Sequence, residues 1–516
     1  MATVRAGLGD NGALRTLGLA LGALALGLAG GVAVAAGNPL IPFALLAAVL
    51  PLPWLLTRPQ ADLWLVAAVI TLLPFGTLPA KIGFTPTLLE VGILLLAGVA
   101  IFAGSRADDP AWRGLVRSPL DGAVLLFIGV ISFAFVLGLG RDSSTEIVHN
   151  YIKLLLAIAL FFLVGQVLRT ADAIRRFMQV LILSGGLAAA IGLVLWRLPQ
   201  PLAERLLLYL QPIGYPMAGV LRFVEAGPAL GKERAIGTSV DPNSFAGLLV
   251  VLIALTLTQL LGKRPCLPRP LLAAIVAAEA AALVFTYSRT ALVAVLAAAL
   301  LVGALRYRKL AIALLVTGVA VVLSGLGGSY TDRLVSGFLL QDQAQLMRIS
   351  EFQNAGTIIA RYPFFGVGFG QAGELDLTTG VSSIYLTITE RTGLLGMAAF
   401  AAVIIGFFLL LAPFLPNRPD PPTTAPALSE YPHSERSEES EHPTPHSALR
   451  TPHSDLDATL LGAAAAVLGA LVVGLADHYF FNTEQSHLTA LLWLCLALGL
   501  SARRLLIAEC GVRSAE

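Results

Sequence analysis

The sequence predicts an all-α membrane protein, a polytopic bundle of about 14 transmembrane helices (range about 12 to 14). Hydrophobic residues make up 56% of the 516 residues and charged residues only 13%, whereas soluble domains carry roughly a quarter charged residues. The mean hydropathy is +0.80. Apolar blocks of about 18 to 23 residues recur along the chain, which is the length that crosses a bilayer. These observations favour one membrane bundle over several soluble domains.

The expected helices follow from the apolar windows, with boundaries soft by several residues. The first window has Arg5 and Arg15 ahead of it and resembles a signal peptide, but it is long enough to span and is interpreted as an uncleaved first helix. In chain order, the windows place helices near residues 14–36, 40–57, 61–79, 87–104, 120–140, 152–168, 176–196, 244–262, 270–287, 290–306, 309–326, 384–415, 458–477 and 486–502.

The distribution of basic residues predicts the orientation. With the N-terminus in the cytoplasm, most of the arginines and lysines fall in inside segments, and the short outside turns hold very few. We therefore expect a multi-pass protein of the cytoplasmic (inner) membrane with both termini cytoplasmic. The net charge of +2 gives no reason to expect a nucleic-acid partner.

Three connections are longer than turns: residues 197–243 and 327–383 outside, and 416–457 inside. The inside connection holds nine prolines and eight acidic residues, which predicts a disordered linker whose deletion between 420 and 455 is tolerated. The loop 327–383 carries apolar residues at helical spacing, which predicts an amphipathic helix at the membrane surface: Leu346, Ile349, Phe352, Ala355 and Ile359.

Four parts follow from this organisation. Residues 1–140 form N-terminal transmembrane helices, and 141–415 form a transmembrane core with the two outside loops. Residues 416–457 are the linker, and 458–516 are the C-terminal helices with a short tail.

Arg289 is the sharpest candidate for a functional side chain. It lies in Phe285-Thr-Tyr-Ser-Arg-Thr290, between two apolar helices at their expected outer ends. A snorkelling anchor explains it, and so does a fixed guanidinium that faces a phosphate.

Arg234 lies with Lys232 just before an expected helix. Asp241 and Asn243 flank Pro242 at the start of that helix, where either can serve as a cap. The same helix N-terminus, with the two basic residues nearby, is also suited to an anion.

Other ionisable and glycine-rich positions admit two interpretations. Arg361 begins Arg361-Tyr-Pro-Phe-Phe-Gly-Val-Gly-Phe-Gly370, where a glycine-rich bend that lets the loop pack against the bundle is favoured over a nucleotide loop. Glu279 and Glu90 lie within expected spans with no evident partner, and fit either a neutral or paired carboxylate or an ion relay. His149, His478 and His487 lie near outer helix ends, and any of them could act as a base.

Four motifs in order resemble the O-antigen ligase and O-antigen polymerase superfamily of bacterial envelope enzymes. They are Arg234…Gly237…Asp241-Pro-Asn, Thr286-Tyr-Ser-Arg-Thr290, Arg348…Pro363…Gly366-Val-Gly-Phe-Gly370, and Ser382-Ser-Ile-Tyr-Leu386…Gly393-Leu-Leu-Gly396. The resemblance covers roughly residues 140 to 415.

The resemblance implies a membrane-embedded, metal-independent glycosyltransferase of the GT-C-like class with no cofactor. Such enzymes move a glycan from undecaprenyl diphosphate onto an acceptor hydroxyl, so the partners are a lipid-linked oligosaccharide donor and a glycan or lipid acceptor. By motif position, Arg234 and Arg289 would hold the diphosphate. The remaining expected substrate contacts are Lys232, Asp241, Asn243, Arg348, Arg361 and Tyr385.

The sequence departs from the ligase motif at one position. The ligase branch has a histidine, the expected base, where this chain has Ser382 followed by Ser383. Serine cannot take up a proton near neutral pH, and losing a general base costs on the order of 10² to 10⁴ in rate. Glu374, Asp376 and Glu390 are the nearest carboxylates in sequence, and Glu390 joins Ser382 among the candidate catalytic residues.

The serine form is closer to polymerase-like members, so a polymerase or a divergent ligase-like transferase is favoured over a lipopolysaccharide ligase. Two alternatives remain. A polytopic transporter or flippase predicts paired intramembrane charges and internal repeats, and a degenerate, non-catalytic relative would keep the fold without the reaction.

Overall fold

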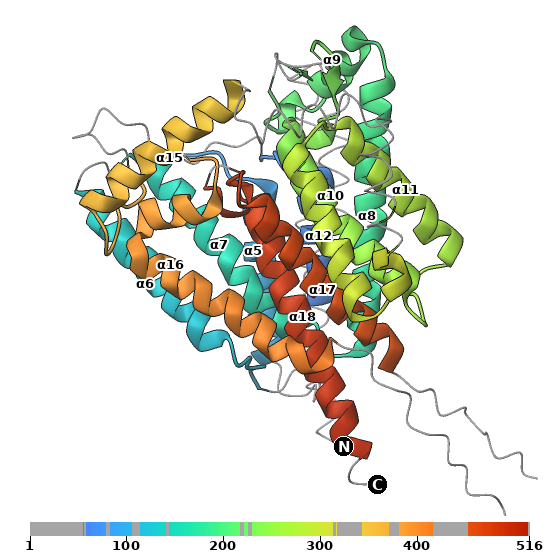
Figure 1. The fold of residues 1–516 in the computed structure, drawn as a ribbon. Helices are drawn as coiled ribbons and strands as arrows, with labels where there is room; N and C mark the ends of the chain where they lie inside the picture. Colours follow the sequence, from blue (N-terminus) through green and yellow to red (C-terminus); the bar gives the residue numbers. More distant parts are fainter. Residues whose placement is uncertain are drawn as a thin grey trace, which may run out of the picture.

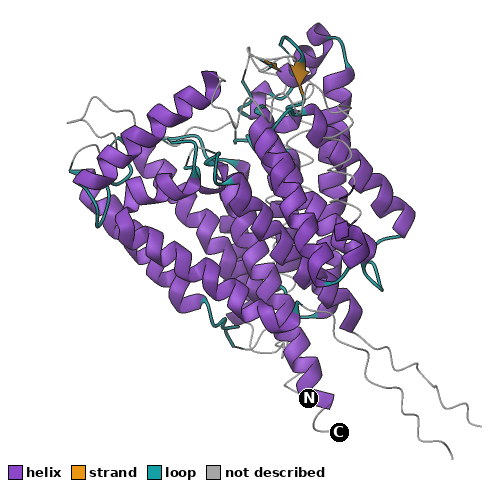
Figure 2. Ribbon diagram, in the orientation of Figure 1, coloured by secondary structure: helices purple, strands orange, loops and turns teal. Residues whose placement is uncertain are grey.

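The computed structural model describes residues 55, 58–78, 83–105, 114–140, 144–216, 221–224, 230–312, 316, 343–370, 381–415, 453–483 and 485–513. Within these ranges the chain is predominantly helical, with one short pair of strands (Figure 2). Several expected features lie outside the described residues: the span at 14–36, most of the spans at 40–57 and 309–326, residues Glu374 and Asp376, and the linker up to residue 452.

The main helices lie close to the apolar windows of the sequence. Their bounds are α4 Pro59–Leu72, α5 Leu88–Ser105, α6 Asp121–Leu139, α7 Thr145–Val167, α8 Ala171–Arg197, α9 Gln200–Leu208, α10 Pro242–Leu261, α11 Arg269–Phe285, α12 Arg289–Leu305, α15 Gln343–Arg361, α16 Ile384–Leu411, α17 His453–Val473 and α18 Ser486–Arg513.

Seven of the described helices are long and apolar enough to cross a membrane, and three shorter apolar helices accompany them. An all-α membrane bundle is thus confirmed, while the count of about 14 spans, the GT-C-like subclass and the division into four parts stay predictions. Helix α17 begins at His453, inside the segment 416–457 that the sequence assigned to the linker, so that boundary was placed too late.

Helices α10, α17 and α18 form the centre of the bundle (Figure 1). Small residues bring α10 and α17 together: a Cβ at Gly469 would lie 2.6 Å from Val250 Cγ1, and Ala463, Ala464 and Ala465 are fully buried. Helices in lipid associate through such close packing, because the surrounding tails are as apolar as the side chains. Helix α6 instead exposes large apolar residues, among them Leu126, as expected of a face that meets lipid.

Two structures gather at the end of the bundle away from the C-terminal end of α18 (Figure 1). One is α9 with an antiparallel strand pair, β1 Arg222–Phe223 and β2 Glu233–Arg234, in which Arg222 pairs with Arg234. The other is α15, the helix expected from the apolar spacing in loop 327–383. We call this the site end; that it is extracytoplasmic stays a prediction from the distribution of basic residues.

Helix α15 packs through a narrower face than the sequence predicts. Ala355 and Ile358 are buried, whereas Phe352 of the expected apolar face is exposed. Ile358 packs against Val367 of the glycine-rich segment, and that contact sets which side of the helix faces the protein.

The glycine-rich segment after α15 bends against the bundle, as favoured from the sequence. The amides of Val367 and Gly368 each donate to a backbone carbonyl of α16, at Glu390 and Arg391, over 2.9 Å. Gly368 has a positive φ and lies against Gly138 of α6. Because these two amides are used within the fold, the segment is not arranged as a phosphate cradle.

The structure shows Glu90 as a paired carboxylate, one of the interpretations that the sequence left open, although its partner was not evident there. His149 of α7 lies with Nε2 2.8 Å from Glu90 Oε1 of α5, and both residues are buried. Glu279 of α11 is also buried, and one of its carboxylate oxygens accepts a hydrogen bond from Thr256 of α10 over 3.3 Å. The His149–Glu90 pair joins residues 59 positions apart, which no local pattern reveals.

Candidate functional site

Arg234 is fixed where strand β2 meets the turn between α11 and α12. Its Nε donates to the carbonyl of Thr286 over 2.7 Å, and its Nη2 donates to Asn243 Oδ1 over 2.7 Å. The next amide, of Ala235, donates to the carbonyl of Phe285 over 2.8 Å. A guanidinium held by two good hydrogen bonds keeps its orientation, and its remaining N–H groups are set in a fixed direction.

An aromatic pair supports this arrangement from α8. Trp196 donates from Nε1 to the carbonyl of Glu233 over 3.0 Å, and its ring stacks on Phe285 with centroids 3.8 Å apart. The end of α8 therefore clamps both the strand that carries Arg234 and the turn that leads to Arg289.

Arg289 is the first residue of α12, three residues after the Thr286 carbonyl that binds Arg234. Between them, Tyr287 has a positive φ of 55°, and the N-cap residue Ser288 makes no side-chain capping hydrogen bond. The first-turn amides of an uncapped helix attract anions. The structure thus brings the Arg234 segment and Arg289 together at the site end, beside a helix N-terminus.

Asp241 serves as the N-cap of α10. Its Oδ1 accepts hydrogen bonds from the amides of Asn243 and Ser244 over 2.9 and 2.7 Å, which confirms the capping interpretation. Because those amides are occupied, the N-terminus of α10 is not the free anion site that the sequence also allowed. Asn243 instead contributes by orienting Arg234.

A second charged group lies where α15, the start of α16 and the α17–α18 connection meet. Arg348 Nη2 is 3.7 Å from Asp477 Oδ1, and Glu351 Oε2 accepts a hydrogen bond from the amide of Ser382 over 3.0 Å. The carbonyl of Gly474 accepts from the amide of Ile384 over 2.9 Å. These contacts place Asp477 on a connection that packs directly against the start of α16.

Asp477 and Tyr479 were missed in the sequence, although their neighbour His478 was singled out. Asp477 is 6% exposed, and burial, the largest cause, raises its pKa to about 7; Arg348 lowers that pKa and Asp241 raises it. Burial and the nearby carboxylates of Asp241 and Asp477 also raise the pKa of Tyr479. Residue 477 is the last residue of an expected span. The search for ionisable residues at span ends that singled out Arg289 could therefore have found this carboxylate as well.

Several predicted site residues lie apart from this group or have structural contacts. Arg361 is exposed at the far end of α15, about 20 Å along the helix from Arg348. Lys232 is exposed on the hairpin. Tyr385 donates to the carbonyl of Leu471 over 2.9 Å and so ties α16 to α17.

Glu390 is buried on α16, seven residues inward from Ser383, or about 10 Å along the helix. Both of its carboxylate oxygens lack a hydrogen-bond partner within the described part of the chain. Its backbone carbonyl accepts a hydrogen bond from the amide of Val367 in the glycine-rich bend.

The three histidines are likewise held in local contacts. His149 pairs with Glu90, and His478 stacks on Tyr479 with centroids 5.1 Å apart. His487 is buried, with Nε2 3.1 Å from Ser244 Oγ. Among the described residues, no three His, Cys, Asp or Glu side chains are grouped so as to hold a metal ion.

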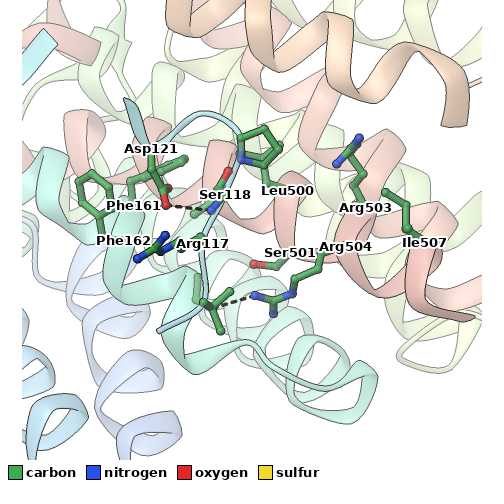
Figure 3. Close-up of a pocket in the computed structure, with 14 residues that line it drawn as sticks. Arg117, Ser118, Asp121, Phe161, Phe162, Leu500, Ser501, Arg503, Arg504 and Ile507 are labelled. Carbon is green, nitrogen blue, oxygen red and sulfur yellow. Dashed lines mark hydrogen bonds between the residues drawn. The ribbon is translucent and has the colours of Figure 1, made fainter. Parts of the chain in front are cut away.

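A pocket of about 250 Å³ lies at the other end of the bundle, between the end of α7, the start of α6 and the C-terminal half of α18 (Figure 3). Arg504 donates to the carbonyls of Gly165 and Leu168, and Arg503 to that of Leu410. Cationic side chains commonly bind the last carbonyls of helices in this way. These arginines therefore stabilise helix ends, and the pocket is separate from the site end.

A family comparison gives one finding that bears on this arrangement. Residues 272–401 match the O-antigen ligase family model, a span that includes α12, α15 and most of α16, with Arg289, Arg348 and Ser382. Arg234 and Asp477 lie outside the matched residues. A search of curated proteins finds no match to the chain. The chain is thus an integral membrane protein in which one segment, residues 272–401, is similar to the O-antigen ligase family.

Proposed function

We propose that this protein transfers or polymerises a glycan carried on undecaprenyl diphosphate, joining it to an acceptor hydroxyl at the outer face of the cytoplasmic membrane. The match of residues 272–401 to the O-antigen ligase family supports an O-antigen ligase-like or polymerase-like function in polysaccharide assembly. The partners of that function are a lipid-linked glycan and an acceptor. The protein is, in this proposal, a metal-independent glycosyltransferase.

One observation carries the proposal: the guanidinium of Arg234 is hydrogen-bonded to the turn that ends at Arg289. The donor's diphosphate would lie between these arginines and the uncapped start of α12. As the bond from the sugar carbon to the diphosphate oxygen breaks, negative charge grows on the leaving group. Fixed donors in a site of low dielectric constant stabilise that charge.

The placement of this group at a bundle end suits a lipid-linked substrate. The polyprenyl chain would remain in the membrane beside the apolar helices, and the diphosphate and glycan would reach the site end. Asn243 holds Arg234 in orientation over 2.7 Å, so the site is organised before the donor binds, which reduces the cost of binding.

The test is turnover by the purified full chain with an undecaprenyl-diphosphate-linked oligosaccharide that acts as both donor and acceptor. Arg234→Ala and Arg289→Ala should each lower the rate of glycan lengthening by about 10² to 10³, the effect of removing one fixed donor to a developing charge. Arg205→Ala is the matched control, because Arg205 is exposed on α9 at the same end. Equal loss in all three variants, or no loss in the first two, would refute the clamp.

A further inference from the structure

Glycan transfer to a hydroxyl requires a group that takes up the hydroxyl proton. Serine stands at position 382, where the resemblance places the family's histidine. The Ser382 amide is engaged by Glu351, and the Ser383 hydroxyl lies 3.3 Å from the carbonyl of Gly474. Neither serine can act as a base near neutral pH.

The segment that packs against these serines carries a carboxylate. Gly474 binds the start of α16 through its carbonyl, and Asp477 follows three residues later, with its amide bonded to the carbonyl of Val473 over 3.0 Å. The connection between α17 and α18, which contacts Ser383 and Ile384 directly after this position, therefore carries Asp477. Its side chain is also within reach of Arg348.

The charged groups that act on Asp477 come from several elements around it. Arg348 and Glu351 lie on α15, Arg234 lies on β2, Asp241 caps α10, and Tyr479 lies on the same connection as Asp477. Asp477 thus shares one electrostatic environment with Arg234, the proposed diphosphate ligand. Its pKa of about 7, raised by burial, falls where a general base is most effective at neutral pH.

We propose that Asp477 is the general base of the transfer reaction and that Arg348 is its positioning residue. This inference rests on the proposed function. The Asp477 carboxylate takes the proton of the acceptor hydroxyl as the acceptor oxygen bonds to the sugar carbon. The bond between that carbon and the diphosphate oxygen breaks, and its electron pair leaves with the diphosphate. The proton on Asp477 then passes to water.

The other candidate bases are less well placed. Glu351 is nearby, but one carboxylate oxygen is bound by the Ser382 amide, which gives it the task of holding the start of α16. Glu390 lies deeper in the bundle. His487 is buried, and its Nε2 is in contact with Ser244.

The experiment measures single-turnover glycan lengthening by the full chain in lipid nanodiscs, from pH 5 to pH 9, together with the dissociation constant for undecaprenyl diphosphate. Asp477→Asn has nearly the same shape but cannot accept the proton, and Asp477→Glu keeps a base. Glu279→Gln is the matched control, a buried carboxylate outside the site.

The transfer rate of Asp477→Asn should fall by about 10² to 10⁴. Its dissociation constant for undecaprenyl diphosphate should change by less than about threefold, the small effect usual for a substitution that removes no contact with the ligand. The wild-type rate should rise with pH through about 7, the pKa of Asp477, and this rise should be missing in Asp477→Asn. Asp477→Glu should be faster than Asp477→Asn. Glu279→Gln should keep the wild-type rate and pH profile.

A wild-type rate that Asp477→Asn retains, with the same pH profile, would overturn this inference and leave the proposed function standing. If Asp477→Asn does not fold, Arg348→Ala decides. Arg348 lowers the pKa of Asp477, so its loss should move the midpoint of the rate profile to higher pH, and an unmoved midpoint would exclude Asp477 as the base. Absence of turnover in folded wild-type protein would overturn the proposed function and this inference with it.

Discussion

The kink at Gly393 within α16 allows a direct test of how this helix packs against the glycine-rich bend. Gly393 has φ 70° and ψ −174°, a combination that essentially only glycine adopts and that costs about 1 to 3 kcal/mol for other residues. A Cβ added there would collide with the backbone of Phe364 and Phe365. Because a backbone segment cannot rotate away as a side chain can, this collision adds about 1 to 3 kcal/mol of overpacking to the conformational cost.

Gly393→Ala should therefore lose roughly 2 to 6 kcal/mol of folding free energy. It should also displace the glycine-rich bend, because the amide of Leu394 donates to the carbonyl of Pro363 over 2.7 Å. Since the segment before Gly393 carries Ser382 and Ser383, we expect glycan transfer to fall as well. The assay is thermal unfolding in detergent, followed by turnover below the transition.

Gly356→Ala is the matched control for this prediction. Gly356 is exposed in α15, and outside its chain neighbours and the backbone of its own helix no atom lies within 4 Å of an added Cβ. Alanine is favoured over glycine in a helix by about 1 kcal/mol, so the unfolding temperature should stay the same or rise. A Gly393→Ala protein as stable as the Gly356→Ala protein would refute the described geometry of α16.

Three further predictions concern single features. Asn243→Ala removes the partner of Arg234 Nη2 and should weaken binding of undecaprenyl diphosphate about 10-fold, since a hydrogen bond to a charged group contributes about 1.5 to 3 kcal/mol; unchanged binding in a titration would contradict this. Burial raises the pKa of Asp477 from 3.8 to about 7, so the stability that its protonated form contributes is present below pH 3.8 and is lost as pH rises through about 7. Between pH 4 and pH 8 the free energy of unfolding of Asp477→Asn should therefore rise relative to the wild type by up to about 4 kcal/mol in thermal unfolding; an equal difference at both pH values would show that Asp477 does not titrate there. Deletion of residues 420–450, which stops before α17 begins, should leave the unfolding temperature unchanged, because this proline-rich and acidic segment lacks the apolar residues of a core; loss of folded protein on gel filtration would refute that view.

Most of the helices could be predicted from the sequence because each depends on a local property, the length of an apolar run. The helical spacing in loop 327–383 predicted α15 for the same reason. Helix ends were less accurate: α7 begins at Thr145 and α17 at His453, because polar residues in a first turn do not belong to the apolar window.

The candidate site was only partly accessible from the sequence. The proximity of the Arg234 segment and Arg289 followed from motif order and a common side of the membrane, and Asp241 could be assigned as a cap from its position before Pro242. The contact of Asp477 with Arg348 spans the segment 416–457, so nothing in local spacing links them. The pairing of Glu90 with His149 escaped for the same reason, as it depends on how α5 packs against α7.

The most direct test of the account is the equilibrium binding of undecaprenyl diphosphate and undecaprenyl monophosphate to the full chain, without any transfer reaction. The wild type should prefer the diphosphate, and Arg234→Ala and Arg289→Ala should each weaken diphosphate binding by at least about 10-fold, the loss of one charge-assisted contact, while Arg205→Ala should not. Equal binding of the two lipids, or wild-type diphosphate binding in both variants, would contradict the claim that these arginines form a diphosphate site.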